Sequence, residues 1–208
     1  MSAGSDVASV RPVEVEKIRD GLWRWTAPHP DWKPDSEGWE RDVGCVYYEG
    51  PDAVVLIDPL VPADGADRFW GALDHDVEKA ALPVVVLRTV HWHQRSIDEV
   101  VARYPAARSA AESGPLPAGV EAHRMAKDET IFWIPEHRAL VPGDVLLGTP
   151  DGGMRPCPDS WLPEGTSGED LRQSLRPLLD FPVEMVLLSH GRPILSGGRE
   201  ALAAALEN

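Results

Sequence analysis

Short apolar runs of strand length recur in both halves of this chain, and they constrain its fold more than any other feature. Residues 53–57 and 83–87 are apolar throughout and are bounded by Gly, Pro, Asp or Arg, which is typical of buried strands. Stretches with helical spacing lie between the strand-like runs in each half. Two strand-rich halves that each carry helices predict an α/β fold in which two sheets pack face to face with helices outside.

The same patterns place the individual elements. We expect strands at residues 13–18, 22–26, 43–49, 53–58, 83–90, 120–125, 129–134, 138–144 and 183–191, and helices at residues 66–81, 96–104, 169–180 and 199–208. Residues 27–42 are too rich in proline for a helix, and residues 148–168 have the composition of one long Gly/Pro loop. Ser96 is expected to be the N-cap of the second helix.

The length and composition of the chain favour one soluble domain. At 208 residues, and with no change of composition that would mark a linker, we expect a single domain over residues 1–208. No apolar stretch approaches the roughly 20 residues of a membrane span. The N-terminal sequence lacks the basic and apolar regions of a signal peptide. A cytoplasmic location is therefore expected.

The charge of the chain excludes two classes of partner. A formal net charge of -14 argues against a nucleic-acid backbone and against anionic membrane surfaces, because both need a basic face. A small-molecule substrate is the expected partner, and the sequence leaves the oligomeric state open. Cys45 and Cys157 are too few for a disulfide framework and match no zinc-ligand spacing, so we interpret them as buried or loop thiols.

Polar residues that directly follow apolar strands are the candidate functional residues, because strand ends are rigid and the loops after them face solvent. Asp58, the pair His91 and His93, Asp144 and His190 all hold such positions. Imidazoles and carboxylates together form a ligand set for zinc or another divalent metal. A lone His-X-His pair is more often a solvated or core pair, but the later Asp and His favour a metal site.

The order of the segments "LIDP", "HWH", "LVPGD" and "LLSHGRP" resembles the metallo-beta-lactamase fold superfamily. The resemblance runs from about Val43 to the end of the chain, and it rests on the order and strand context of motifs that are individually short. It implies a four-layer α/β/β/α sandwich with a metal centre at one edge, between the two sheets.

The resemblance also assigns residues. His91 and His93 match the first two histidines of the family's His-x-His-x-Asp-His motif, Asp144 matches its bridging carboxylate, and His190 matches its late histidine. Asp58 matches a supporting aspartate of the early strand. The resemblance therefore implies a metal site made of His91, His93, Asp144 and His190.

The chain departs from the family pattern at two places. Arg95 and Ser96 stand where the motif has its Asp and its final His, so a second metal would lose two ligands. A further ligand histidine of the family falls near Met125, and His123 lies two residues away. His123 is either a substitute ligand or an ordinary strand histidine, and both readings stay open.

Arg95 is the residue that most affects the expected chemistry. A guanidinium stays charged and does not ligate metals, so Arg95 would act as a fixed cation beside the site and repel a second divalent ion. It could pair with Asp144 and donate to a substrate carbonyl or carboxylate. Alternatively, Arg95 points to solvent and pairs with an acid such as Asp98.

We therefore expect a metal-dependent hydrolase with at most one metal, acting on a small ester, lactone, amide or thioester. A divalent ion, zinc in the first place and iron in the second, would serve with Asp144 and Arg95 as the catalytic residues. The alternatives are a non-catalytic binding relative without metal, and an iron-dependent oxidoreductase or lyase. Trp32, Trp39 and Trp161 lie in loops where they could wall an apolar pocket, and Arg155 is either an anion contact or a plain loop arginine.

Overall fold

The computed structural model describes residues 13–34, 39–109, 115–125 and 129–207. Its largest sheet has the strand order β1-β2-β3-β4-β5-β6. The bounds of these strands are β1 Glu14–Arg19, β2 Leu22–Pro28, β3 Asp42–Glu49, β4 Val54–Ile57, β5 Val84–Leu87 and β6 Arg108–Ser109. β1 to β4 pair antiparallel, whereas β4, β5 and β6 run parallel.

A second sheet has four strands in the order β12-β9-β8-β7, and a two-stranded hairpin joins β10 and β11. The bounds are β7 Glu121–Arg124, β8 Thr130–Ile134, β9 Ala139–Val141, β10 Leu146–Gly148, β11 Met154–Pro156 and β12 Met185–Val186. The α-helices are α1 Ala66–Ala80, α2 Ile97–Arg103, α3 Gly168–Leu175 and α4 Gly198–Glu207. Short 3-10 helices span η1 Pro135–His137, η2 Asp159–Trp161 and η3 Arg176–Asp180.

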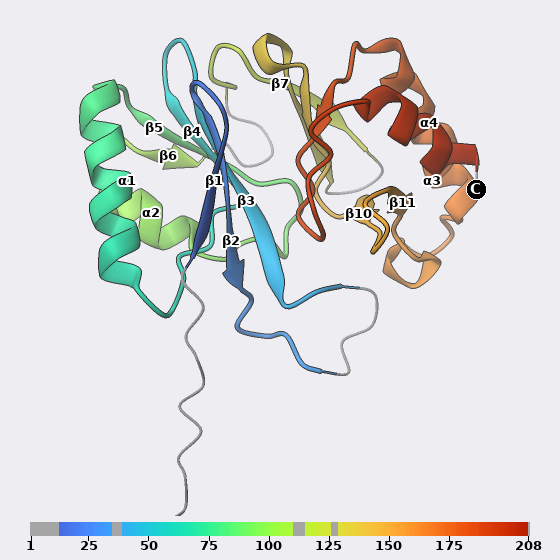
Figure 1. The fold of residues 1–208 in the computed structure, drawn as a ribbon, viewed down its shortest axis with the longest axis horizontal. Coiled ribbons are helices and arrows are strands. Elements are labelled where there is room, and N and C mark those ends of the chain that lie inside the picture. The colour runs from blue at the N-terminus through green and yellow to red at the C-terminus, as the bar shows by residue number, and fades with distance from the viewer. Residues whose placement is uncertain (1–12, 35–38, 110–114, 126–128, 208) are drawn as a thin grey trace, which may run out of the picture.

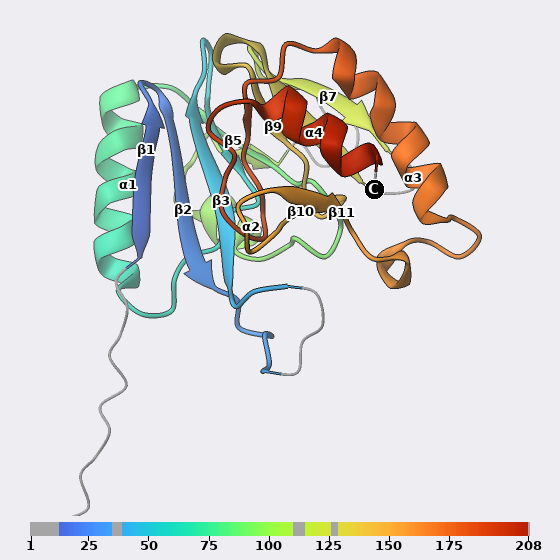
Figure 2. The same ribbon diagram turned by 45° about the vertical axis from the view of Figure 1, so that its right-hand side comes forward.

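The elements form four layers, as Figures 1 and 2 show: α1 and α2 lie outside the first sheet, and α3 and α4 lie outside the second. Three groups of buried apolar side chains separate these layers. Among those between the two sheets are Tyr48, Ile57, Leu87, Ile134 and Leu187. Each sheet therefore has apolar side chains packed on both of its faces. The expected α/β/β/α architecture is confirmed.

Parallel pairing brings the candidate residues to one edge. β4 and β5 pair in register from Val54–Val84 to Ile57–Leu87, with α1 as the crossover between them. Both strands therefore end at the same edge of the first sheet. In the second sheet β12 pairs parallel with β9, so the segments after these two strands also leave at one edge.

The two sheets meet directly at this edge. The amide of Gly44, near the start of β3, donates to the carbonyl of Ser189 at 2.7 Å, and Val43 forms an isolated bridge with His190. Arg24 on β2 reaches across the same junction and donates from Nη2 to the carbonyls of Leu188 and Gly191. These contacts hold the segment after β12 against the first sheet.

The junction leaves no room for a side chain at Gly44. A Cβ there would lie 2.5 Å from Nη2 of Arg24 and 2.5 Å from the carbonyl oxygen of Leu188. We expect Gly44→Ala to lower the free energy of unfolding by about 3 kcal/mol, because the backbones must move apart. Gly71→Ala is the control: it lies in α1 with nothing within 4 Å of an added Cβ, and should stabilise the protein by roughly 0.5–1 kcal/mol. Urea unfolding that gives both variants the same sign would contradict this account.

Several local expectations need correction. The strand expected at residues 183–191 is paired as a ladder over Met185–Val186 alone, and the predicted loop 148–168 contains the hairpin strand β11. The third helix ends at Leu175 and continues as η3, since Pro177 has no amide to donate. Ser96 holds the N-cap position without a side-chain cap bond.

The hydroxyl of Ser96 is used elsewhere in the fold. Its Oγ accepts a hydrogen bond from the amide of Val61 at 3.0 Å, and its own amide donates to the carbonyl of Pro59. Ser96 therefore links the turn after β5 to the segment after β4. A side-chain cap forms on α3, where Ser167 and Asp170 make a capping box.

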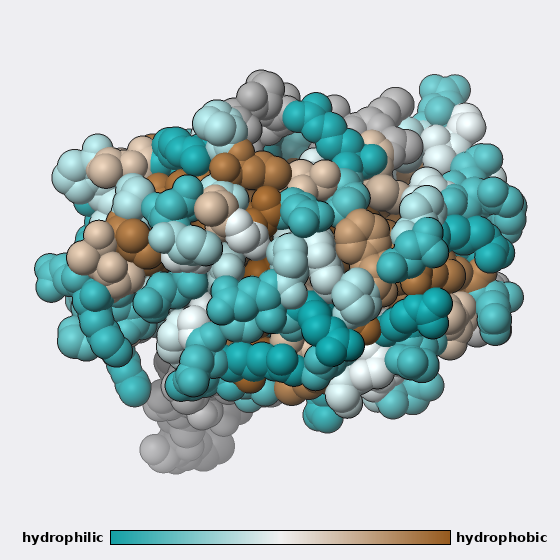
Figure 3. Space-filling view, turned by 90° about the horizontal axis from the view of Figure 1, so that it is seen from above, coloured by the Kyte–Doolittle hydropathy of each residue, from teal (hydrophilic) through white to brown (hydrophobic). Residues whose placement is uncertain are grey.

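The face of the molecule seen from above (Figure 3) is largely polar. Figure 3 shows one face on which hydrophilic residues predominate, with smaller hydrophobic groups between them. Across the described ranges, no helix combines the length and apolar character that crossing a membrane requires.

Candidate metal centre

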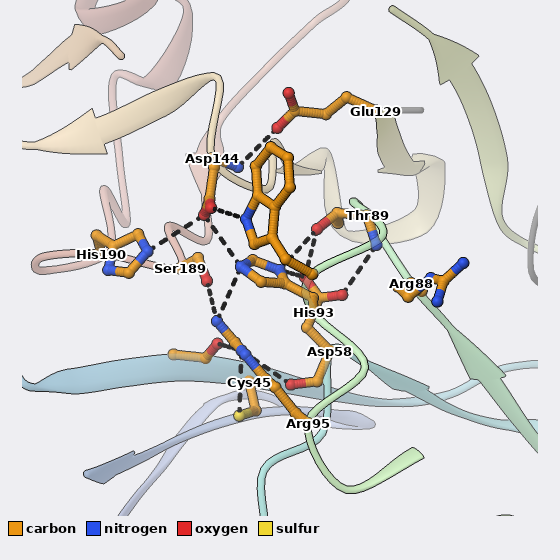
Figure 4. Close-up of polar contacts among 12 residues, drawn as sticks. Cys45, Asp58, Arg88, Thr89, His93, Arg95, Glu129, Asp144, Ser189 and His190 are labelled. Atoms are coloured by element: carbon orange, nitrogen blue, oxygen red, sulfur yellow. Dashed lines mark hydrogen bonds and ion pairs between the residues drawn. The ribbon is translucent and has the colours of Figure 1, made fainter. Parts of the chain in front are cut away.

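Three side chains from the two sheets meet at their common edge (Figure 4). His93 lies in the turn after β5, Asp144 follows β9, and His190 follows β12. Each is buried and offers one ligand atom, and the three atoms lie within 4.8 Å of one another. Oδ1 of Asp144 is 3.2 Å from Nε2 of His93 and 3.2 Å from Nε2 of His190. We call these residues the His–Asp–His group.

Asp58 contacts the ring nitrogen of His93 that faces away from Asp144. Oδ2 of Asp58 lies 2.9 Å from Nδ1 of His93, and Oδ1 accepts a hydrogen bond from the amide of Thr89 at 2.8 Å. A carboxylate at Nδ1 keeps the proton on that nitrogen, and the tautomer is inferred from this contact. Nε2 of His93 therefore faces Asp144, in the orientation that a metal ligand needs.

Burial and mixed charges shift the pKa values of the group. Burial raises the pKa of Asp144, but His93 and His190 lower it more, so the pKa stands well below its usual value. Burial raises the pKa of Asp58 too, and His93 and Arg95 outweigh that effect. For His93, burial and Arg95 lower the pKa, but Asp58 and Asp144 raise it more, to about 9. Metal binding at neutral pH would thus displace a proton from His93.

The raised pKa of His93 predicts a pH dependence of the metal-free chain. Its folded-state pKa of about 9 exceeds the ordinary value of 6.5, so its stabilisation is complete below pH 6.5 and is lost as the pH rises through 9. The expected loss is on the order of 3 kcal/mol. Urea unfolding of chelator-treated protein between pH 6 and 9.5 measures it. His93→Gln should flatten this dependence, and an equal slope in that variant would rule out His93 as its source.

Arg95 points into the site. Nη1 donates to the carbonyls of Gly44 at 3.2 Å and of Asp58 at 3.0 Å, and Nη2 donates to Oγ of Ser189 at 2.9 Å. Nη2 also lies 3.1 Å from Nε2 of His93. The alternative in which Arg95 pairs with Asp98 at the surface is wrong, because these contacts hold the side chain inside the fold. Its backbone has a φ of 35°, a value uncommon outside glycine.

The structure does not bring the other two candidate histidines to the His–Asp–His group. Residues 91–96 form a turn in place of a continued strand, so His91 and His93 do not project to the same side. His91 is exposed, and its ring packs edge-on against Trp92 at 4.6 Å. His123 lies on β7 with its ring against Phe181 at 4.8 Å.

Two residues that the sequence did not single out contact Asp144. Nε1 of Trp92 donates to Oδ2 of Asp144 at 2.7 Å, and Oε1 of Glu129 accepts a hydrogen bond from the Asp144 amide at 3.0 Å. Burial and the nearby Asp144 raise the pKa of Glu129 to about 7. The position of Trp92 between the two histidines was the available signal for its role. No pattern in the sequence pointed to Glu129.

Comparison with solved structures identifies the architecture. The crystal structure of VMB-1 aligns with a TM-score of 0.61 at 12% identity, over 94% of this chain and 97% of that one. The DIM-1 metallo-beta-lactamase aligns with a TM-score of 0.57 at 11% identity, over 94% and 96% of the two chains. A metallo-beta-lactamase from Hirschia baltica aligns at 0.56 and 14% identity, over 95% and 97%.

This chain has the metallo-beta-lactamase fold. The expectation drawn from the order of its strand-end motifs is confirmed at the level of the fold. No family model matches the sequence, and no curated protein matches it.

In this metallo-beta-lactamase fold the His–Asp–His group opens into a pocket of about 420 Å³, which we call the outer pocket. Its walls include Trp39, Trp92 and Trp161, and the rings of Trp39 and Trp161 lie 5.4 and 6.1 Å from the His190 ring. Trp32 instead donates from Nε1 to the carbonyl of Trp39. Arg155 lies away from the outer pocket, on β11.

The residues of the group fit one metal ion. Among the described residues, Oδ1 of Asp144 is buried and has no hydrogen-bond partner, although two imidazole nitrogens lie 3.2 Å away. A buried carboxylate oxygen in this state is costly unless a proton or a cation satisfies it. Two imidazoles and a carboxylate also match the ligand preferences of zinc and iron. Arg95 places a fixed positive charge beside His93, which opposes a second ion.

Proposed function

We propose that this chain is a hydrolase that uses one divalent metal ion to cleave a small ester, lactone, amide or thioester. His93, Asp144 and His190 would hold the ion, with zinc as the first candidate and iron as the second. The observation that carries this proposal is the convergence of three buried ligand atoms within 4.8 Å, at an edge that opens into a tryptophan-lined pocket.

Each residue of the site has a role in this proposal. An ion held here supplies Lewis acidity and lowers the pKa of water in its open positions. Asp144 stays ionised because its pKa is held low, so its Oδ1 can serve as a ligand of the ion. Arg95 contributes its positive charge where a carbonyl oxygen would become negative. Three of the five N–H bonds of Arg95 already donate to Gly44, Asp58 and Ser189, so the role that we assign to Arg95 is carried by its charge.

The metal content of the purified protein tests this proposal. Protein prepared without added metal is expected to carry about one zinc or iron ion per chain by mass spectrometry, and His190→Ala should lose it. His91→Ala is the matched histidine control and should retain the ion, because His91 lies outside the group. A chain that carries no metal and cannot be reloaded with zinc or iron would overturn the proposal.

A second candidate function is metal-free binding of a small molecule in the outer pocket. It is favoured by one contact: Nη2 of Arg95 lies 3.1 Å from Nε2 of His93, the nitrogen that would ligate a metal. Without an ion, the negative charges of Asp58 and Asp144 balance the positive charges of Arg95 and a protonated His93. This candidate predicts that ligand binding survives chelation, which separates it from the hydrolase.

In both candidate functions the proposed binding partner is a small molecule. A small molecule fits the outer pocket, whose volume falls within the roughly 300–1,000 Å³ of ligand sites. The net charge of -14 continues to disfavour nucleic acid as the substrate.

A further inference from the structure

A second, smaller cavity lies next to the outer pocket. It has a volume of about 140 Å³, and we call it the inner cavity. Trp92, Asp144 and Trp161 line both spaces, so the inner cavity and the outer pocket adjoin at Asp144 of the His–Asp–His group. A molecule that reaches Asp144 from the outer pocket can therefore extend one of its groups past Trp92 into the inner cavity.

The walls of the inner cavity are largely apolar. The residues that give it this character are Val90, Met125, Val145, Cys157, Leu162 and Leu171. The described residues that line it include no lysine and no arginine, and its acidic members Glu129 and Asp170 disfavour an anionic group. Glu129 is already engaged by the amide of Asp144. The chemistry of the walls selects a neutral, apolar group.

The volume limits the size of that group. An apolar cavity of about 150 Å³ is large enough to bind one benzene molecule and stays free of water. The inner cavity, at about 140 Å³, has nearly the same capacity. A phenyl ring or a branched alkyl group of similar size would fill it, whereas two fused rings would not.

We propose that the inner cavity binds one benzene-sized apolar group of the substrate. The preferred substrates are then neutral carbonyl compounds that carry a phenyl or compact branched alkyl group near the carbonyl. That the substrate contains a carbonyl group rests on the proposed hydrolase function. That the inner cavity binds an apolar group rests on the cavity alone.

Binding of hydrocarbons to the metal-free protein tests the inference without any turnover. Benzene and toluene are titrated into chelator-treated protein, and binding is followed by tryptophan fluorescence, because Trp92 and Trp161 line the cavity. We expect saturable binding at one site, at least tenfold weaker for naphthalene. No saturable benzene binding, or naphthalene binding as tight as benzene, would overturn the inference.

Two filling variants locate the bound hydrocarbon. Cys157→Phe and Thr166→Phe each add a ring from a different wall of the inner cavity, and each folded variant should lose benzene binding at least tenfold. Leu195→Phe is the control, since Leu195 is an exposed residue that lines neither space, and it should bind benzene like the unmodified chain. Circular dichroism confirms which variants fold. Benzene binding that survives in a folded filling variant would place the hydrocarbon elsewhere and overturn the inference.

The outcomes separate this inference from the hydrolase proposal. Benzene binding in a chain that purifies without metal and cannot be reloaded with zinc or iron supports the inner cavity and contradicts the hydrolase. One bound metal without benzene binding supports the hydrolase and contradicts the inner cavity.

Discussion

If the proposed function holds, Asp144→Asn is expected to weaken metal binding by more than about 100-fold and to abolish hydrolysis. Loss of a residue that merely orients a ligand already costs about 10- to 100-fold in metal affinity, and Asp144 supplies the charge of the site itself. Its Oδ1 lies 3.2 Å from both imidazoles of the group, so the amide removes the shared anionic contact of His93 and His190. Competition with a chelating dye measures the affinity.

Asp98→Asn is the matched control for this change. Asp98 is an exposed aspartate in α2, close to the same turn, and it accepts a hydrogen bond from Nε2 of Gln94. The control variant should bind metal as the unmodified chain does. If Asp144→Asn retained the metal as well as Asp98→Asn does, Asp144 would not be a ligand.

Arg95→Ala is expected to have two opposite effects. It should lower the free energy of unfolding by about 3 kcal/mol, because hydrogen bonds from a charged group contribute roughly 1.5–3 kcal/mol and Arg95 links three separate segments. Those segments contribute Gly44, Asp58 and Ser189 as acceptors. It should also raise metal affinity, because the variant removes a cation 3.1 Å from Nε2 of His93. Urea unfolding of the metal-free protein and dye competition measure the two effects.

Arg88→Ala is the control for Arg95→Ala, because it removes another arginine from the same region of the chain. Arg88 precedes the same turn and donates from Nη1 to Oε1 of Gln94, outside the His–Asp–His group (Figure 4). Its replacement should leave metal affinity unchanged, because Arg88 does not contact the His–Asp–His group. An equal rise in metal affinity in the two variants would contradict the effect assigned to the charge of Arg95.

The fold was predictable because its signals are local. Apolar runs such as residues 53–57 and 83–87 bury both faces in any sheet, and the helical segments between them need one apolar face against a sheet. The details that failed depend on partners far along the chain. Residues 187–190 after β12 pair by isolated contacts, such as Val43 with His190, which no local pattern encodes.

The candidate site was predictable in part for the same reason. His93, Asp144 and His190 each follow a buried strand, and parallel pairing brings such strand ends together. The position of His91 was not predictable, because the His-X-His pattern does not say whether the chain continues as a strand or turns. The turn sends His91 to the surface, and it aims Arg95 inward through a backbone conformation with positive φ.

The sequence by itself determined the layers of this protein and which strand ends carry histidine or aspartate side chains, because burial and side-chain type are properties of each segment. The tertiary structure alone decided how those side chains meet. It set Nε2 of His93 between Asp144 and Arg95, fixed one oxygen of Asp144 to Trp92, and opened an apolar cavity beside them. These features depend on distances between segments that are far apart in the sequence, and only the packing of the two sheets fixes such distances.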